Sequence, residues 1–188
     1  RAVSNAARRR IRTNVRRMIT LVEPSEQLRD SWRESRDEFR DSHIHGYSIF
    51  GFTEEELATD DGFDRWLAQQ RRNLTDPPEG YVPSALYWIV DDEEPGRVLG
   101  SLNLRFALND FLREQGGHIG YGVRASARRR GVATAALMAS LDKARERGMD
   151  RVLVTCETTN VASARTIERC GGVLEDVRGD KRRYWITL

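Results

Sequence analysis

Apolar residues recur at helical spacing in four segments of the chain. Ser25 is a candidate N-cap for the first helix, and Thr53 with Glu56 forms a capping-box pattern ahead of the second. A long helix is expected after Gly131, and a short one over residues 163–170. The apolar positions that give the first three helices one buried face are Leu28, Trp32, Phe39, Phe63, Trp66, Leu67, Leu137, Met138, Leu141 and Ala144.

Runs of β-forming residues separate these helices and predict strands. They cover residues 19–22, 85–90, 101–106, 118–123, 152–156, 173–177 and 183–188. The turn composition of residues 91–96 joins the second and third strands into a hairpin. Strands and helices therefore alternate through most of the chain. This order is typical of an α/β fold with a mixed, centrally parallel sheet of about seven strands and about four helices.

The composition excludes several classes of protein. With 39% hydrophobic and 32% charged residues, the chain can bury a core, and no apolar run approaches the roughly 20 residues of a membrane span. Cys156 and Cys170 are too few for a disulfide framework, and no Cys or His cluster has metal-ligand spacing. We therefore expect no metal and no membrane partner, and the cysteine usage favours a reducing cytoplasm.

Charge is unevenly distributed along the chain. Residues 1–17 hold seven arginines and no acid, and without them the formal net charge of +2 becomes −5, from 24 basic and 29 acidic residues. We expect a basic N-terminal tail or upstream extension over 1–17 and a single domain over 18–188. The tail is a candidate for binding nucleic acid, but its lack of aromatic residues and the acidic body argue against that function.

The segment from Gly120 to Ala133, GYGVRASARRRGVA, is the most informative part of the sequence. A polar loop with Arg128, Arg129 and Arg130 leads directly into the long helix at Gly131. The first turn of a helix has free N–H groups and the positive end of the helix dipole, so it can hold a phosphate. Taken alone, however, three arginines before a glycine more often form a solvated loop at the start of a helix, so both interpretations stay open at this point.

The same segment also satisfies the dinucleotide fingerprint G-x-G-x-x-A through Gly120, Gly122 and Ala125. In that fingerprint the glycines lie between a strand and a helix, and an acidic residue ends the next strand. Here the glycines lie inside the expected strand, and no acidic residue stands at the required distance. The dinucleotide interpretation is therefore disfavoured.

Arg128, Gly131 and Ala133 match the signature (Arg/Gln)-x-x-Gly-x-(Gly/Ala) between a strand and a long helix, so the chain resembles the GNAT acyltransferase superfamily. The resemblance extends to Asn160 and is strong over residues 117–175. Within the superfamily, the segments GGHIGY, TCE-x-x-N and RYW are similar to a group of bacterial acetyltransferases. The resemblance implies a three-layer fold whose sheet is splayed between the fourth and fifth strands.

The resemblance implies acetyl-CoA as co-substrate and an N-acetyltransferase activity. The pyrophosphate would lie on backbone amides of 129–134, and the pantetheine arm would pair with the backbone of 121–123 and with Asn160. The implied acetyl-CoA contacts are Tyr121, Gly122, Val123, Arg128, Arg129, Arg130, Gly131, Val132, Ala133, Thr134, Asn160 and Ser163. If catalysis has been lost, the same site would serve a non-catalytic acyl-CoA-binding regulator.

Direct acetyl transfer to an amine needs a general base and a general acid. His118 lies next to the common base position of the superfamily and has an ordinary pKa near 6.5; Glu157 ends the fifth strand on the side of the cleft. Many members carry a tyrosine acid seven residues after Asn160, but this chain has Ile167 there, which leaves Tyr184, water or another group. A buried strand-end histidine and a solvated carboxylate are the alternative interpretations of the two candidate bases.

The acceptor is expected to be a small-molecule or peptide amine. The acidic body favours a cationic acceptor, whereas Arg105, on the same strand face as Asn103, could pair with an acidic acceptor group. The loop with His43 and His45 is expected to line the acceptor cleft, where Tyr47, Phe50 and Trp66 form either core or wall. Because superfamily members often dimerise, the resemblance also implies a homodimer as a candidate assembly.

Overall fold

The computed structural model of the chain describes residues 18–39 and 44–188. The basic tail over 1–17 and His43 therefore lie outside the described residues. The elements are β1 (Ile19–Val22), η1 (Glu26–Leu28), α1 (Arg29–Asp37), α2 (Glu54–Ala58), α3 (Asp60–Arg72), β2 (Ser84–Asp91), β3 (Glu94–Arg105), η2 (Leu112–Gly116), β4 (Ile119–Val123), η3 (Ala125–Ala127), α4 (Val132–Glu146), β5 (Arg151–Glu157), α5 (Val161–Arg169), β6 (Val173–Arg178) and β7 (Lys181–Thr187).

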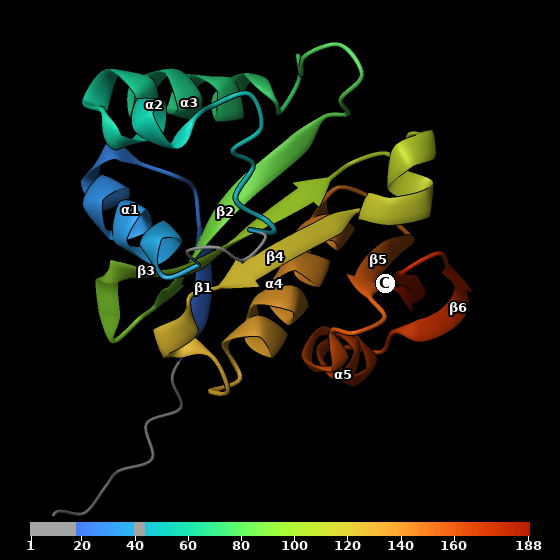
Figure 1. Ribbon diagram of the computed structural model, residues 1–188. Coiled ribbons are helices and arrows are strands. Elements are labelled where there is room, and N and C mark those ends of the chain that lie inside the picture. Colours follow the sequence, from blue (N-terminus) through green and yellow to red (C-terminus); the bar gives the residue numbers. More distant parts are fainter. Residues whose placement is uncertain (1–17, 40–43) are drawn as a thin grey trace, which may run out of the picture.

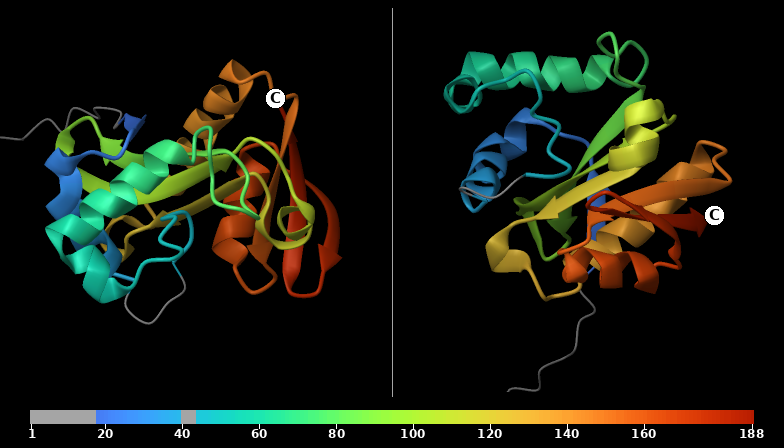
Figure 2. Two further views of the ribbon diagram at one scale, coloured as in Figure 1. Left: turned by 90° about the horizontal axis from the view of Figure 1, so that it is seen from above. Right: turned by 45° about the vertical axis from the view of Figure 1, so that its right-hand side comes forward.

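The strands form one mixed sheet in the order β1-β2-β3-β4-β5-β7-β6. Only β4 and β5 run parallel, and the other neighbours are antiparallel. The helices α1, α2 and α3 cover one face of the sheet, and α4 lies behind the other with α5 beside β5 (Figures 1 and 2). The expected three-layer α/β fold with a central parallel pair is confirmed.

Two hydrophobic cores lie on the two faces of the sheet. Alternate residues of β3 divide between them, because successive side chains of a strand point to opposite faces. Leu102 and Leu104 belong to the core under α4 and α5. Ser101, Asn103 and Arg105 therefore point toward the face that carries α1–α3.

Aromatic residues dominate the core under α1 and α3. Trp32 of α1 stacks on Trp66 of α3 with ring centroids 4.4 Å apart, and both lie near Trp88 of β2. The Trp66 indole N–H donates to the Ser48 carbonyl at 3.0 Å, so the loop after α1 is attached to α3. Tyr47 and Trp66 are fully buried and belong to this core, so they do not form the wall of the cleft.

Some local expectations need correction. Ser25 makes no side-chain cap; the chain enters α1 through the short 3-10 turn η1 instead. The capping box of Thr53 and Glu56 is confirmed, but the helix that it starts ends at Ala58, and Thr59 then caps a separate α3. Met138 is 55% exposed and does not belong to the buried face of α4.

No helix in the described ranges is long and apolar enough to cross a membrane.

The loop between α1 and α2 lies with its backbone directly on the sheet. Gly46 has φ +80°, and a Cβ atom there would come within 2.6 Å of the Tyr121 Cα and 2.8 Å of the Gly120 oxygen. Gly51 in the same loop has φ +82°, but a Cβ there would meet nothing within 4 Å. The two glycines thus share a left-handed backbone but differ in their surroundings.

We expect Gly46→Ala to destabilise the protein more than Gly51→Ala. Both substitutions carry the left-handed cost of roughly 1–2 kcal/mol, but only Gly46→Ala also forces the loop away from β4, for roughly 1–3 kcal/mol more. Urea denaturation measures both free energies of unfolding. Equal losses in the two variants would show that the loop is not packed on the sheet at Gly46.

Candidate active site

The sheet opens between its two parallel strands. β4 and β5 share a single ladder pair, Ile119 with Val154, and just before it the His118 N–H donates to the Leu153 carbonyl at 2.7 Å. Beyond that pair, toward Val123 and the end of β5, the ladder stops. The splay expected between the fourth and fifth strands is therefore present.

The open edge of β4 presents peptide groups to this gap. The Arg124 N–H donates to the Leu99 carbonyl of β3 at 2.9 Å. Because the peptide groups of a strand point alternately to its two sides, those of Gly122 and Gly120 also face β3. The peptide groups of Tyr121 and Val123 therefore face the opening. The Val123 carbonyl accepts a hydrogen bond from the Arg128 side chain at 2.8 Å, which agrees with this alternation. An extended ligand with amide groups could pair with this edge as an added strand does.

The N-terminus of α4 lies beside the same opening. Gly131 is its N-cap with φ +80° and has no side chain to satisfy the first-turn amides, so these N–H groups can bind an anion. Arg129, two residues earlier, also has a positive φ, of 59°. Because two residues so close together have a left-handed backbone, the chain turns sharply into the helix. The loop therefore lies next to the first turn of α4.

A cleft of about 1630 Å³ connects these features. The sequence-predicted residues that line it are Tyr121, Gly122, Val123, Arg128, Arg129, Gly131, Val132, Ala133, Thr134, Glu157, Asn160 and Ser163. The lining of the cleft does not include Arg130, which is exposed, or His118 and Tyr184, which are buried. His45, Phe50 and Arg105 also line the cleft.

Asn160 and Ser163 form the start of α5. The Asn160 side-chain oxygen caps the helix by accepting from the Ser163 N–H at 3.0 Å, which leaves its amide N–H₂ as a donor in the cleft wall. The Ser163 hydroxyl is 2.8 Å from the Tyr121 hydroxyl, so a hydrogen bond joins α5 to β4 across the opening. Burial raises the pKa of Tyr121 to about 12, so its hydroxyl stays protonated at neutral pH.

His118 is held in a way that does not suit a general base. Its Nδ1 accepts a hydrogen bond from the Leu153 N–H at 2.8 Å, so its free lone pair is already used. Burial, with the nearby charges of Arg105, Arg113 and Arg151, lowers its pKa to about 4. The interpretation of His118 as a buried strand-end histidine therefore fits the structure better than the catalytic one.

Tyr184 belongs to the core under α4 and α5, with 2% of its surface exposed. Its hydroxyl donates to a Glu168 carboxylate oxygen at 3.2 Å. Burial, and that hydrogen bond, raise its pKa. The expected cleft-facing tyrosine is thus directed away from the opening. Ile167, at the position where many superfamily members carry a tyrosine, is fully buried.

Glu157 ends β5 on the face that carries α1–α3, because Val154 and Cys156 point to the opposite core. Its side chain is 42% exposed and lies 3.5 Å from the Lys181 amino group. Glu157 therefore lines the cleft as a solvated carboxylate with a cationic neighbour. Cys156, by contrast, is buried with a raised pKa caused mainly by burial, as expected of a core thiol.

Glu38 is a residue that sequence reasoning missed. At the end of α1, its carboxylate accepts from the Arg124 Nε at 2.7 Å and from the Ser126 N–H at 2.8 Å. Arg124 is 5% exposed and also donates to the Val98 carbonyl. Phe39 adds a second contact, since the Arg128 guanidinium lies 5.4 Å from its ring. The end of α1 thus fixes the segment that leads into the loop before α4.

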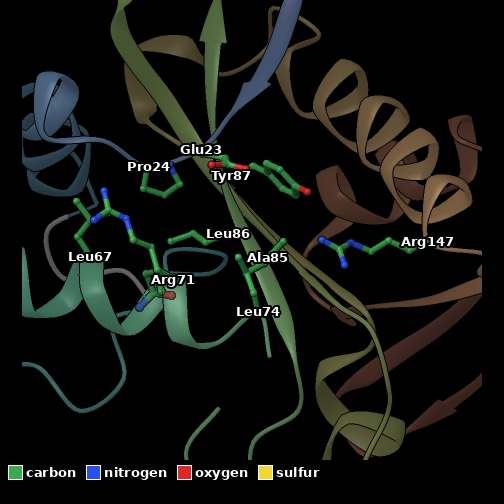
Figure 3. A pocket seen from close by; sticks show the side chains of 10 residues that line it. Glu23, Pro24, Leu67, Arg71, Leu74, Ala85, Leu86, Tyr87 and Arg147 are labelled. Atoms are coloured by element: carbon green, nitrogen blue, oxygen red, sulfur yellow. The ribbon is translucent and has the colours of Figure 1, made fainter. Parts of the chain in front are cut away.

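A second, smaller pocket of about 150 Å³ lies at the edge of β2, just past the end of β1 (Figure 3). Arg71 of α3 and Arg147, just after α4, approach it from opposite sides of β2, and Glu23 lies beside Tyr87 (Figure 3). This pocket shares no lining residue with the cleft at β4.

The sequence profile described as "Acetyltransferase (GNAT) domain" matches residues 19–173. The chain belongs to the GNAT acetyltransferase family. This confirms the resemblance first carried by Arg128, Gly131 and Ala133. No curated protein sequence matches the chain significantly.

Several solved GNAT structures share this fold at low sequence identity. The microcin C7 self-immunity acetyltransferase MccE, solved with acetyl-CoA and AMP, is 18% identical with a TM-score of 0.63 over 91% of this chain and 93% of that one. RimJ of Mycobacterium smegmatis, solved in complex with CoA-disulfide, is 20% identical with a TM-score of 0.66 over 90% and 81%. The ribosomal-protein-S5-alanine acetyltransferase of Vibrio fischeri is 16% identical with a TM-score of 0.62 over 90% and 91%.

We expect Glu38→Gln to lower the free energy of unfolding by on the order of 3 kcal/mol, because it leaves the buried Arg124 charge without a carboxylate. The exposed Glu146→Gln is the control and should change it by less than about 0.5 kcal/mol. Hydrogen bonds from Arg124 and Ser126 outweigh the effect of burial and lower the Glu38 pKa below its ordinary value of 4.5.

A group with a lowered pKa in the folded state stabilises the protein above its unfolded pKa and loses that effect as the pH falls through the folded pKa. The stability difference between the wild type and Glu38→Gln should therefore be full at pH 7 and shrink below pH 4.5. Denaturation curves between pH 3 and pH 7 would measure it. A difference independent of pH would contradict the charged role of Glu38.

Proposed function

We propose that this GNAT domain is an acetyl-CoA-dependent N-acetyltransferase that transfers an acetyl group directly to a primary amine. The observation that carries the proposal is the open edge of β4 at Tyr121 and Val123, next to the uncapped N-terminus of α4. A long ligand with amide groups at one end and a pyrophosphate at the other matches this pair of features. Acetyl-CoA is such a ligand, and structural neighbours were solved with acetyl-CoA or CoA-disulfide.

In this proposal the pyrophosphate lies on the first-turn amides of α4, with Arg128 and Arg129 adding charge-assisted hydrogen bonds. The pantetheine amides pair with the peptide groups of Tyr121 and Val123, and the Asn160 amide donates to the arm. The thioester then reaches the part of the opening where β4 and β5 come together. Backbone N–H groups of β4 are available there to polarise its carbonyl oxygen.

The amine must lose a proton, and the proposed base is Glu157. Its carboxylate lies in the cleft on the acceptor face of β5, whereas His118 is hydrogen bonded within the sheet. Either direct contact or one bridging water would connect Glu157 to the amine. Loss of this proton leaves the neutral amine that attacks the thioester carbon.

The departing thiolate needs a hydrogen-bond donor and a proton, and the proposed hydrogen-bond donors are the paired hydroxyls of Tyr121 and Ser163. They lie 2.8 Å apart across the opening, on the α5 side of the sheet. Because burial raises the pKa of Tyr121, its hydroxyl stays protonated at neutral pH and donates a hydrogen bond to the sulfur as negative charge develops there. The proton that the thiolate finally takes then comes from solvent and balances the one that Glu157 removes from the amine. These hydroxyls would replace the tyrosine whose position is taken by Ile167.

The buried Ile167 also supports a second candidate, an acyl-CoA-binding regulator without turnover. Release of CoA in the presence of acetyl-CoA and a panel of amines separates the two. The regulator would bind acetyl-CoA without consuming it.

We expect Gly131→Asp to abolish most of the stabilisation that acetyl-CoA gives. It places a carboxylate at the proposed pyrophosphate site, where a like charge repels the ligand. The matched control is Gly148→Asp at the other end of α4, since both glycines have positive φ and open space for a Cβ. The wild type and Gly148→Asp should rise in melting temperature by several degrees with acetyl-CoA in hundredfold excess over its dissociation constant. An equal rise in Gly131→Asp would refute the loop assignment.

For Glu157→Gln we expect kcat to fall roughly a hundredfold or more while acetyl-CoA binding is kept, because the amide cannot accept the proton of the amine. Tyr184→Phe is the control, since its hydroxyl contacts Glu168 in the core and not the cleft. CoA release measured with a thiol reagent gives both rates. Wild-type turnover in Glu157→Gln would remove Glu157 as the base.

A further inference from the structure

Arg105 lies at the end of β3 and reaches the floor of the cleft on its acceptor face. One guanidinium nitrogen, Nη1, donates to the carbonyls of Gly116 and Gly117 at 3.2 and 3.1 Å. These two bonds fix the side chain in place under Gly120, where a Cβ would lie 3.7 Å from both Nη atoms. The remaining guanidinium N–H groups are available to a ligand in the cleft.

Arg105 is half-buried and has no carboxylate partner, unlike the arginines that are fully buried in the described part of the chain. Arg36 pairs with Glu54, Arg124 with Glu38, and Arg183 with both Glu175 and Asp176. Among residues 18–39 and 44–188, no carboxylate lies within ion-pair distance of the Arg105 guanidinium, and burial lowers its pKa to about 10. A cation that is partly removed from water is stabilised by an anion, so an acidic group on a ligand in the cleft would stabilise Arg105.

The anion that fits Arg105 is not the phosphate of acetyl-CoA. Arg105 pairs with the start of β4, through its N–H to the His118 carbonyl, whereas the phosphate-binding loop follows the other end of that strand. The five residues of β4 separate the two ends by roughly 13–16 Å. Arg105 also points to the α1–α3 face, while α4 covers the opposite one.

The rest of the cleft agrees with an anionic acceptor that has an apolar part. The described lining includes six arginine or lysine side chains and two carboxylates, Glu54 and Glu157. Arg128 and Arg129 belong to the proposed pyrophosphate site, and the other four cations still outnumber the carboxylates. The acidic balance of the body therefore does not extend into the cleft, and it gives no support to the cationic acceptor expected from net charge. Phe50 and Phe111 line the same cleft and are 65% and 67% exposed, which is typical of an apolar binding surface.

We propose that Arg105 binds a carboxylate or phosphate group of the acceptor, so that the substrates are primary amines that also carry an anion. This inference rests on the proposed N-acetyltransferase function and specifies its acceptor. The guanidinium fork suits both anions, because it can donate two parallel hydrogen bonds to either. The alternative is that Arg105 only supports the loop at Gly116 and Gly117.

The test compares matched pairs of amines with saturating acetyl-CoA, using CoA release as the readout. L-phenylalanine and L-phenylalaninamide differ in a carboxylate, and O-phosphoethanolamine and ethanolamine differ in a phosphate. We expect Arg105→Gln to lower the anionic-to-neutral ratio of kcat/KM by roughly tenfold to a hundredfold, the loss of a charge-assisted hydrogen bond. The pair that shows the larger change identifies the anion. Comparing each ratio with the wild-type ratio cancels differences in amine basicity.

Arg145→Gln, on the exposed surface of α4, is the matched control and should keep the wild-type ratios. Arg105→Lys should give intermediate ratios, because it keeps the charge but loses the fork, and it serves as the test if Arg105→Gln does not melt cooperatively. Wild-type ratios in both Arg105 variants would overturn the proposal and leave Arg105 a support for the loop.

If neither anionic amine is acetylated, calorimetry with CoA and N-acetyl-L-phenylalanine or N-acetyl-O-phosphoethanolamine decides the question. Binding to the wild type and weaker binding to Arg105→Gln would support the proposal, and no binding to the wild type would overturn it. The proposed function is tested separately, since a wild-type protein that acetyl-CoA does not stabilise would refute that function itself.

Discussion

The single ladder pair between β4 and β5 is the constraint on which the rest of the site depends. Parallel strands normally continue pairing along their length, but here the pairing ends after Ile119 and Val154. The peptide groups that would have bonded the neighbouring strand are instead turned toward a cleft. Because β3 holds the other edge of β4 along its whole length, the strand keeps its shape without β5. An open edge on a firmly held strand is what allows a ligand to complete the sheet.

The splay also divides the chemistry between the two faces of the sheet. Tyr121 sends its ring toward α5 and its hydroxyl to Ser163, while its peptide groups face the gap. Glu157 and Arg105 point to the opposite face, where the loop after α1 covers β4. In the proposed function, acetyl donor and acceptor would thus approach the same point from two sides, without competing for the same side chains.

Much of this arrangement was predictable from the sequence. Element order and strand periodicity gave the sheet, and Arg128, Gly131 and Ala133 indicated both the loop and the family, because these features depend on local spacing. The surroundings of His118 and Tyr184 were harder to predict. His118 lies in the bend just before β4 and Tyr184 lies on β7, and in both places the direction of the side chain decides whether it reaches the cleft or the core. Glu38 and Arg124 are 86 residues apart and carry no local signal for their ion pair. The sign of the charge in the cleft could not be predicted from the net charge either, because net charge does not say which residues come together in the fold.

The contact between Glu38 and the segment at Arg124 and Ser126 has a consequence for how two substrates are bound. The same helix that ends at Glu38 bears Trp32 in the aromatic core on the acceptor side, and the segment it holds leads into the loop for the donor. If the proposed acceptor displaced α1 on binding, the loop before α4 would move with it, because Glu38 holds both. Thermodynamic linkage makes such an effect equal in both directions, so the acceptor would alter the affinity for acetyl-CoA by the same factor as acetyl-CoA alters the affinity for the acceptor. In the proposed function, Glu38 and the neighbouring Phe39 would thus couple the binding of the two substrates.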